Sequence, residues 1–309
     1  MELKQKRILL TGGGGFLGSK IVSLLKEKDV DEIIIPNSKN DDLRIKENCY
    51  RLTKDADIVI HLAAKVGGIG LNQEKPGELF YDNLMMGTQL IEESRKNGVQ
   101  KVIALGTICS YPKFTVLPFS EKTIWDGYPE ETNAPYGLAK KMLLVQSDAY
   151  RQQYKFNSIV VFPTNLYGPN DNFNDNSSHV IPALIKKIIN AINNKEDSIS
   201  LWGDGTPTRD FLYVDDAAKG IILAAEKYDK SEPINLGTGV EVSIKDLVKM
   251  ILEIMNVNLK VNWETGKPGG QPRRCIDFEK AKKEIGFEPE MGLRQGLEKT
   301  IDWYEKTKN

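Results

Sequence analysis

The sequence is most constrained near its N-terminus, where an apolar run leads into a glycine-rich turn and then a helical pattern. Arg7–Leu10 predict a first strand and Ser19–Lys28 predict the helix that follows. Glycines recur at every third position of the turn, which lets the backbone approach a pyrophosphate while helix N–H groups face its charge. The segment therefore predicts a dinucleotide-binding unit with cofactor contacts at Gly12, Gly15, Phe16, Leu17 and Gly18.

Strand-like and helical patterns alternate along the first half of the chain. Further strands are expected at Glu32–Ile35, Asp57–Leu62, Lys101–Leu105 and Ser158–Phe162, with helices at Pro76–Asn97 and Pro135–Tyr154. Helices of this length between short apolar runs predict an α/β fold with a doubly wound parallel sheet of the Rossmann type. Ligands of such a sheet bind at the carboxyl ends of its strands.

The second half of the chain is less regular. A polar stretch at Gly168–Ser178 interrupts the alternation, which resumes at Arg209–Lys227 and Ile234–Leu236, before helical patterns at Ile244–Met255 and Phe278–Tyr304. We expect residues 1–167 with about 208–238 to form the dinucleotide-binding domain. Residues from about 168–207 with 239–309 would form a smaller mixed α/β substrate lobe.

Tyr136 and Lys140 lie four positions apart on a predicted helix, so their side chains share one face. An isolated phenol has a pKa of about 10, but a neighbouring ammonium favours the phenolate. The hydroxyl of Thr107 can hydrogen-bond the same reacting oxygen. Most such pairs are ordinary exposed helical neighbours. Beside the glycine turn, however, the trio predicts proton transfer at a carbinol or carbonyl oxygen while hydride moves at the attached carbon.

Cys109 follows Thr107 by two residues and is either a small buried hydrophobe or a base that faces a substrate. A thiolate can remove a proton from a carbon beside a ketone, and inversion there needs a second group on the opposite face. The chain has two histidines. His61 lies at a predicted strand end and is expected to be structural or to line the cofactor site. His179 follows the polar stretch and is the natural second group.

The end of the second predicted strand carries the signal for the kind of dinucleotide. An acidic residue there would bind a ribose 2′-hydroxyl and repel a 2′-phosphate. Asn37, Ser38 and Lys39 occupy these positions instead and favour NADP(H). Asp41 and Asp42 follow closely, so NAD stays open on the residues alone, and Lys39 could be an ordinary surface lysine.

Charge and cysteine content exclude several other classes of protein. A net charge of −1 gives no reason to expect nucleic acid or a membrane surface as partner, and no apolar run has the roughly 18 residues of a membrane helix. The sequence shows no signal-peptide pattern. Three scattered cysteines argue against disulfides and a metal site. We therefore expect a cytoplasmic protein without a bound metal.

Longer strings resemble a known family over essentially the whole chain, the extended short-chain dehydrogenase/reductases, and within them the GDP-L-fucose synthases. General marks are the glycine turn, Asn83 and the Tyr136/Lys140 pair. Narrower marks are Ala64–Ile69, Cys109 with Tyr111–Lys113, Pro163–Phe173, Ser178–Leu184 and Trp202–Arg209.

This resemblance implies an NADPH-dependent enzyme that epimerises C3 and C5 and reduces C4 of GDP-4-keto-6-deoxy-D-mannose, giving GDP-L-fucose. Cys109 would be the base and His179 the acid, and the chain would form a homodimer. It implies further cofactor contacts at Asp42, Leu62, Ala63, Ala64, Tyr136, Lys140, Pro163, Asn165, Leu166 and His179. It also implies contacts to the GDP-sugar at Asn165, Lys187, Trp202, Arg209 and Arg273.

Sister reactions fit the sequence less well. Related dehydratases carry an Asp-Glu pair after the catalytic Thr, where this chain has Ile108 and Cys109. A plain 4-epimerase would leave Cys109 and His179 unexplained. A stand-alone 4-ketoreductase or epimerase on a related GDP-hexose or heptose stays open, as does, more remotely, a non-catalytic dinucleotide-binding scaffold. The chain also departs from fucose synthases in its general-form glycine turn and in Thr107, where serine is usual.

Overall fold

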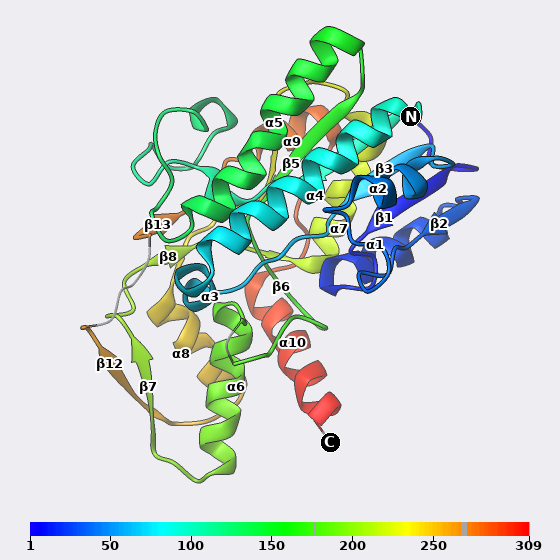
Figure 1. Cartoon of the computed structure of the whole chain (residues 1–309). Helices are drawn as coiled ribbons and strands as arrows, with labels where there is room; N and C mark the ends of the chain where they lie inside the picture. Colours follow the sequence, from blue (N-terminus) through cyan, green and yellow to red (C-terminus); the bar gives the residue numbers. More distant parts are fainter. Residues whose placement is uncertain (176, 267–270, 309) are drawn as a thin grey trace.

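The computed structural model describes residues 1–175, 177–266 and 271–308 (Figure 1). Its central sheet has six parallel strands in the order β10-β5-β4-β3-β1-β2. These strands are β1 (Arg7–Thr11), β2 (Glu32–Ile34), β3 (Ile58–His61), β4 (Lys101–Leu105), β5 (Ser158–Pro163) and β10 (Ile234–Leu236). The strand β2 lies on one side of β1 and β3 lies on the other, so the direction in which the chain crosses the sheet reverses here. This switch point opens a ligand-binding crevice at the carboxyl ends of β1 and β3.

Helices cover both faces of the sheet, which confirms the predicted doubly wound α/β fold. One face packs against α1 (Phe16–Glu27), α7 (Val214–Lys227) and α9 (Glu279–Ile285). The other packs against α2 (Lys46–Thr53), α4 (Pro76–Lys96) and α5 (Ala134–Tyr154). Because both faces are covered, the inner strands are almost continuous runs of buried apolar residues.

A second core lies beyond the carboxyl edge of the sheet, in the lower part of Figure 1. It is built from α6 (Val180–Asn193), α8 (Ile244–Ile254), α10 (Leu293–Lys308), β7 (Ser198–Trp202) and β12 (Lys260–Glu264). The helix α6 was not predicted, and the region expected as one helical pattern at its end is two separate helices, α9 and α10. The expected domain boundaries stay a prediction.

Short strands and turns connect the sheet to this second core. They are β6 (Asn165–Tyr167) with β9 (Phe211–Tyr213), and β8 (Thr208–Arg209) between β11 (Val242–Ser243) and β13 (Arg273–Arg274). The remaining short helices are α3 (Ile69–Glu74), η1 (Ile108–Ser110) and η2 (Glu121–Thr123). Across the described ranges, none of the helices has the length and apolar character needed to cross a membrane.

Candidate active site

A cavity of about 1740 Å³ lies between the carboxyl edge of the sheet and the second core. Its lining includes the glycine turn, then Thr107, Cys109 and Tyr136, and also Trp202 and Arg209. A drug-sized ligand typically occupies roughly 300–1,000 Å³. The cavity is therefore large enough for a dinucleotide and a second nucleotide-sized ligand together.

The glycine turn has the close packing that a pyrophosphate cradle requires. Gly12 has a φ of +75°, and a Cβ added at Gly18 would lie 2.1 Å from the Gly12 carbonyl oxygen. The helix α1 begins at Phe16 and not at the predicted Ser19, so Gly18 lies inside its first turn. Its N-cap is Gly15, which has no side chain to cover the helix end. The turn thus fits a dinucleotide phosphate at the N-terminus of α1.

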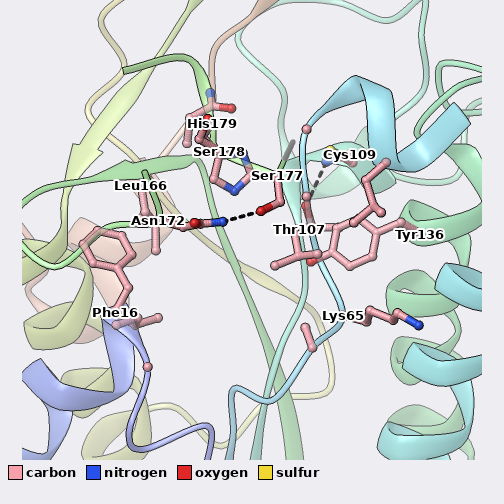
Figure 2. A pocket seen from close by; sticks show the side chains of 18 of the residues that line it. Phe16, Lys65, Thr107, Cys109, Tyr136, Leu166, Asn172, Ser177, Ser178 and His179 are labelled. Carbon is pink, nitrogen blue, oxygen red and sulfur yellow. Dashed lines mark hydrogen bonds between the residues drawn. The ribbon is translucent and has the colours of Figure 1, made fainter. Parts of the chain in front are cut away.

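Thr107, Cys109 and Tyr136 meet because η1 packs directly on the first turn of α5. A Cβ at Gly137 would lie 2.3 Å from the Cys109 carbonyl oxygen, so only glycine permits this approach. Thr107 caps η1, its Oγ1 accepting from the Cys109 N–H at 3.3 Å (Figure 2). Its side chain also hydrogen-bonds Tyr136.

The site favours the protonated hydroxyl of Tyr136 over the phenolate. Burial raises the pKa of Tyr136 well above its usual value, the neighbouring Cys109 adds to this, and the Thr107 hydrogen bond opposes it. This differs from the expectation that Lys140 would favour the phenolate. Desolvation of the phenol, which periodicity does not reveal, is the larger effect.

Lys140 is 1% exposed, and its Nζ has no hydrogen-bond partner among the described residues. Burial lowers the pKa of Lys140 to about 8. His61 is also fully buried, with Nδ1 2.8 Å from Thr11 Oγ1 and Nε2 without a partner in the described chain. An orphaned buried ammonium beside the cavity fits a cofactor ribose, whose hydroxyls would accept from it.

Cys109 and His179 reach the cavity from opposite sides, Cys109 with Tyr136 from one wall and His179 from the other (Figure 2). His179 is the N-cap of α6. His179 is exposed in the ligand-free protein, although it lines the cavity and protein atoms around its ring hinder hydration of the charged form. Burial and the charge of Arg274 lower the pKa of His179.

Where the cavity meets the segment after β2, several polar groups bind one another or nearby arginines. Asn37 N–H donates to Asp41 Oδ2 at 2.8 Å, and Asp41 in turn pairs with Arg51. Asp42 holds Arg44, whose hydrogen bonds lower the pKa of Asp42. The two carboxylates that left NAD open are therefore neutralised by arginines.

The structure brings most of the predicted site residues to this one cavity. Its lining includes Gly12, Gly15, Phe16, Leu17, Gly18, Asn37, Ser38, Asp42, Leu62, Ala63, Ala64, Thr107, Cys109, Tyr136, Pro163, Asn165, Leu166, His179, Trp202 and Arg209. Four predicted residues are not among the lining: Lys140, which is buried, and Lys39, Lys187 and Arg273. Lys187 Nζ donates to the Ser200 carbonyl at 2.6 Å, and Arg273 pairs with Glu241.

Among the lining residues that were missed from the sequence, two make polar contacts with Cys109. Arg274, and not Arg273, faces the cavity, and its Nη1 donates to Cys109 Sγ at 3.5 Å. Asn133, the N-cap of α5, has its Oδ1 3.8 Å from the same sulfur. The sequence analysis named Arg273, but adjacent strand residues point to opposite faces, and β13 turns Arg274 and not Arg273 toward the cavity. Among the described residues no cluster of His, Cys, Asp and Glu could hold a metal ion.

A glycine-turn Rossmann fold with a buried Tyr/Lys pair and a hydroxyl at one cavity defines a dinucleotide-dependent enzyme of the extended short-chain dehydrogenase/reductase class. Comparison with known families narrows this class. Residues 8–237 match the NAD dependent epimerase/dehydratase family, and the chain belongs to that family.

Characterised relatives cover nearly the whole chain. A GDP-L-fucose synthase of Sinorhizobium fredii is 38% identical over 97% of this chain and 96% of its own length. GDP-L-fucose synthase 1 of Arabidopsis thaliana is 36% identical over 99% of this chain and 95% of its own. The crystal structure of a GDP-L-fucose synthetase from Naegleria fowleri bound to NADP superposes with a TM-score of 0.89 at 28% identity, covering 100% of this chain and 95% of that one.

Proposed function

We propose that this protein is an NADPH-dependent enzyme that converts GDP-4-keto-6-deoxy-D-mannose to GDP-L-fucose by epimerisation at C3 and C5 and reduction at C4. The observation that carries the proposal is the placement of Cys109 and His179 on opposite sides of one cavity, beside the Tyr136 hydroxyl. The names of the relatives and the NADP in the Naegleria structure support the same substrate and cofactor.

NADP(H) would lie along the glycine turn, with its adenosine end at Asn37, Ser38 and Asp42. Lys140 would donate to the nicotinamide ribose, which satisfies the ammonium that burial leaves without a partner. When bound, NADPH supplies the hydride for C4. Lys39 lies outside the cavity lining and remains a proposed contact to the 2′-phosphate, which its flexible side chain could reach.

Epimerisation begins with Cys109 as base. The proton on C3 or C5 moves to the sulfur, and the C–H electron pair forms an enolate whose charge the C4 oxygen carries. His179, which must first take up a proton from solvent because its lowered pKa favours the neutral ring, then returns a proton to the same carbon from the opposite face and inverts it. Before the second carbon reacts, Cys109 releases its proton to solvent and His179 takes up another. One enolate chemistry serves both carbons, because each lies next to the C4 ketone.

Reduction follows at the same oxygen. Thr107 holds the C4 oxygen by hydrogen bonding, and Tyr136, kept protonated by its burial, donates its proton to that oxygen. The protonated state found for Tyr136 therefore suits reduction of a ketone. Lys140 beside it would stabilise the phenolate that remains after this transfer.

The GDP portion would lie toward the second core. Arg209 would bind the pyrophosphate, because a guanidinium fork fits two phosphate oxygens, and Trp202 would pack near the base. Asn165, whose Nδ2 donates to the Asp210 carbonyl at 2.8 Å, would face the sugar or diphosphate. Lys187 and Arg273 would join only by exchanging their present partners.

A direct assay separates this function from its alternatives. Purified protein is incubated with the 4-keto sugar nucleotide and NADPH, and both NADPH oxidation and the stereochemistry of the product are followed. GDP-L-fucose is expected. A non-catalytic scaffold would bind NADPH without oxidising it, and a stand-alone ketoreductase would give a product that keeps the D-configuration.

We also propose that the chain is a cytoplasmic homodimer joined through α4 and α5. These helices pack side by side and leave large apolar side chains exposed, including Phe80, Tyr81 and Val145. Two such pairs would bury these side chains in a four-helix bundle. Light scattering at micromolar concentration tests this proposal, and a monomeric mass would disprove the homodimer.

A further inference from the structure

Arg274 lies at the catalytic cysteine and has no part in the function proposed above. It comes from β13, where it pairs in register with Arg209 of β8. Its side chain is held by a 3.0 Å hydrogen bond from Nε to Gln271 Oε1, and Nη1 points at Cys109 Sγ. The residue is 7% exposed, so this contact is shielded from solvent.

Arg274 and Arg209 place two positive charges in one part of the cavity. Within the described residues, neither guanidinium has a carboxylate within ion-pair distance. Burial, followed by the charge of Arg274, lowers the pKa of Arg209 to about 9. Two such cations favour an anion between or beside them. The sulfur of Cys109 is the group in contact with Arg274 that can become one.

When the Cys109 thiol is protonated, its hydrogen-bond acceptor is Asn133. Glu130 accepts from the Asn133 amide, and because a carboxylate can only accept, the amide nitrogen must face Glu130. The Asn133 oxygen therefore faces Cys109 and accepts from the thiol at 3.8 Å. Burial would raise the pKa of Glu130, but hydrogen bonds from Thr132 and Asn133 outweigh it and lower it.

We propose that Arg274 is a positioning residue that donates to Cys109 and stabilises its thiolate form, while Asn133 accepts from the same sulfur once it has taken a proton. This inference rests on the proposed role of Cys109 as base. Before the step, Arg274 donates to the negative sulfur. As the C–H bond breaks and the S–H bond forms, the negative charge passes to the enolate oxygen, and the new thiol turns toward Asn133. Each state of the base thus has a partner of matching polarity.

Other charged and titratable groups lie around the pair formed by Cys109 and Arg274. Arg209 from β8 adds positive charge, and Glu130 adds negative charge from the loop before α5. Tyr136 from α5 is neutral, and His179 approaches Arg274 from the opposite wall. Arg274 is the only cation among the described residues for which a hydrogen bond to Cys109 is found.

The test is alkylation of Cys109 by iodoacetamide as a function of pH, in protein without substrate. Burial raises the pKa values of Cys49 and Cys275 to about 12, so these two thiols stay protonated and react slowly. A Cys109→Ser variant gives their background. Arg274→Gln is compared with Arg274→Lys, which keeps the charge, and with Arg294→Gln, which removes an exposed arginine paired with Glu253.

Arg274→Gln should slow alkylation at neutral pH about tenfold or more and move the midpoint of the pH profile upward by roughly one unit or more. Arg274→Lys should restore most of the rate, and Arg294→Gln should match the wild type. Exchange of C3 and C5 protons with solvent should fall in parallel, as a loss in kcat. If Arg274→Gln does not fold, Gln271→Ala, which frees the guanidinium without removing it, should shift the profile in the same direction.

A pH profile of Arg274→Gln, or of Gln271→Ala in its place, that superimposes on the wild type would overturn the proposal. If Arg274→Gln then raised the KM for the GDP-sugar and left kcat unchanged, Arg274 would be assigned to phosphate binding. The alkylation result does not depend on substrate. If wild-type protein exchanged no C3 or C5 proton while the alkylation shift held, the proposed function would fail and the Arg274 contact would stand.

Discussion

The hydroxyl of Thr11 lies 2.8 Å from Nδ1 of His61 and joins the ends of β1 and β3 at the switch point of the sheet. Both side chains are completely buried. Burial, with a smaller effect from Lys140, lowers the pKa of His61 well below its usual value. His61 therefore stays neutral in the folded protein.

This state predicts a pH dependence of stability. Below about pH 6.5 the unfolded chain binds a proton at His61 that the folded chain does not, so His61 destabilises the fold progressively as pH falls. The loss attributable to this one group is at most about 1.4 kcal/mol per pH unit. His61→Asn keeps a polar atom for Thr11 but does not titrate. Urea unfolding at pH 7.5 and 5.5 should show a smaller loss for the variant than for the wild type, and equal losses would disprove the assignment.

The raised pKa of Tyr136 predicts that reduction and proton exchange can be separated. Tyr136→Phe keeps the ring but removes the proton donor, so reduction should fall by roughly 10²–10⁴-fold. Exchange of C3 and C5 protons with solvent should continue, because Cys109 and His179 remain. Stopped-flow NADPH oxidation and NMR of the sugar measure the two rates. A wild-type rate of NADPH oxidation by the variant would show that Tyr136 is not the acid.

The buried ammonium of Lys140 has no hydrogen-bond partner in the described part of the chain, and this predicts how NADPH affinity depends on pH. Because burial lowers its pKa to about 8, the ligand-free protein loses this charge as pH rises through that value. NADPH affinity should therefore weaken between about pH 7 and 9. Lys140→Met should bind more weakly at pH 7 and show little of this pH dependence. Calorimetric titration checks both, and a wild-type affinity that is flat over this range would contradict the contact.

Close packing at Gly18 predicts that a single methyl group disrupts the cofactor cradle. Gly18→Ala would place a Cβ 2.1 Å from the Gly12 carbonyl oxygen, so the turn must move. Both the melting temperature and NADPH affinity should decrease. Gly77→Ala, at the start of α4, meets no atom within 4 Å and serves as the control. Unchanged NADPH binding by Gly18→Ala would show that the turn is not the cradle.

The sequence predicted the sheet well because its strands are buried on both faces and read as apolar runs. The helix α6 escaped prediction because it follows a polar stretch, although Ile181, Ile185 and Ile188 form its buried face. The site was predicted where motifs have fixed spacing, as in the glycine turn and at Tyr136 and Lys140. Arg274 was not, since its position depends on the register of β13 beside β8, a contact between distant parts of the chain.

The protonation state of Tyr136 also lay beyond the sequence. The motif places an ammonium near the phenol, and that alone predicts a lowered pKa. Packing of η1 against α5 excludes water from the phenol, and this desolvation raises the pKa instead. The sequence therefore predicted Tyr136 as the proton donor, but not that burial raises its pKa.

Deuterium incorporation from heavy water tests the central claim most directly. Wild-type protein is given GDP-4-keto-6-deoxy-D-mannose and NADPH in D₂O, beside Cys109→Ser and His179→Gln. The account predicts an L-configured product with deuterium at C3 and C5 and hydrogen from NADPH at C4. Cys109→Ser should incorporate none, and His179→Gln should exchange but invert slowly. A reduced wild-type product without deuterium at C3 and C5, still of D-configuration, would contradict the account and leave a ketoreductase.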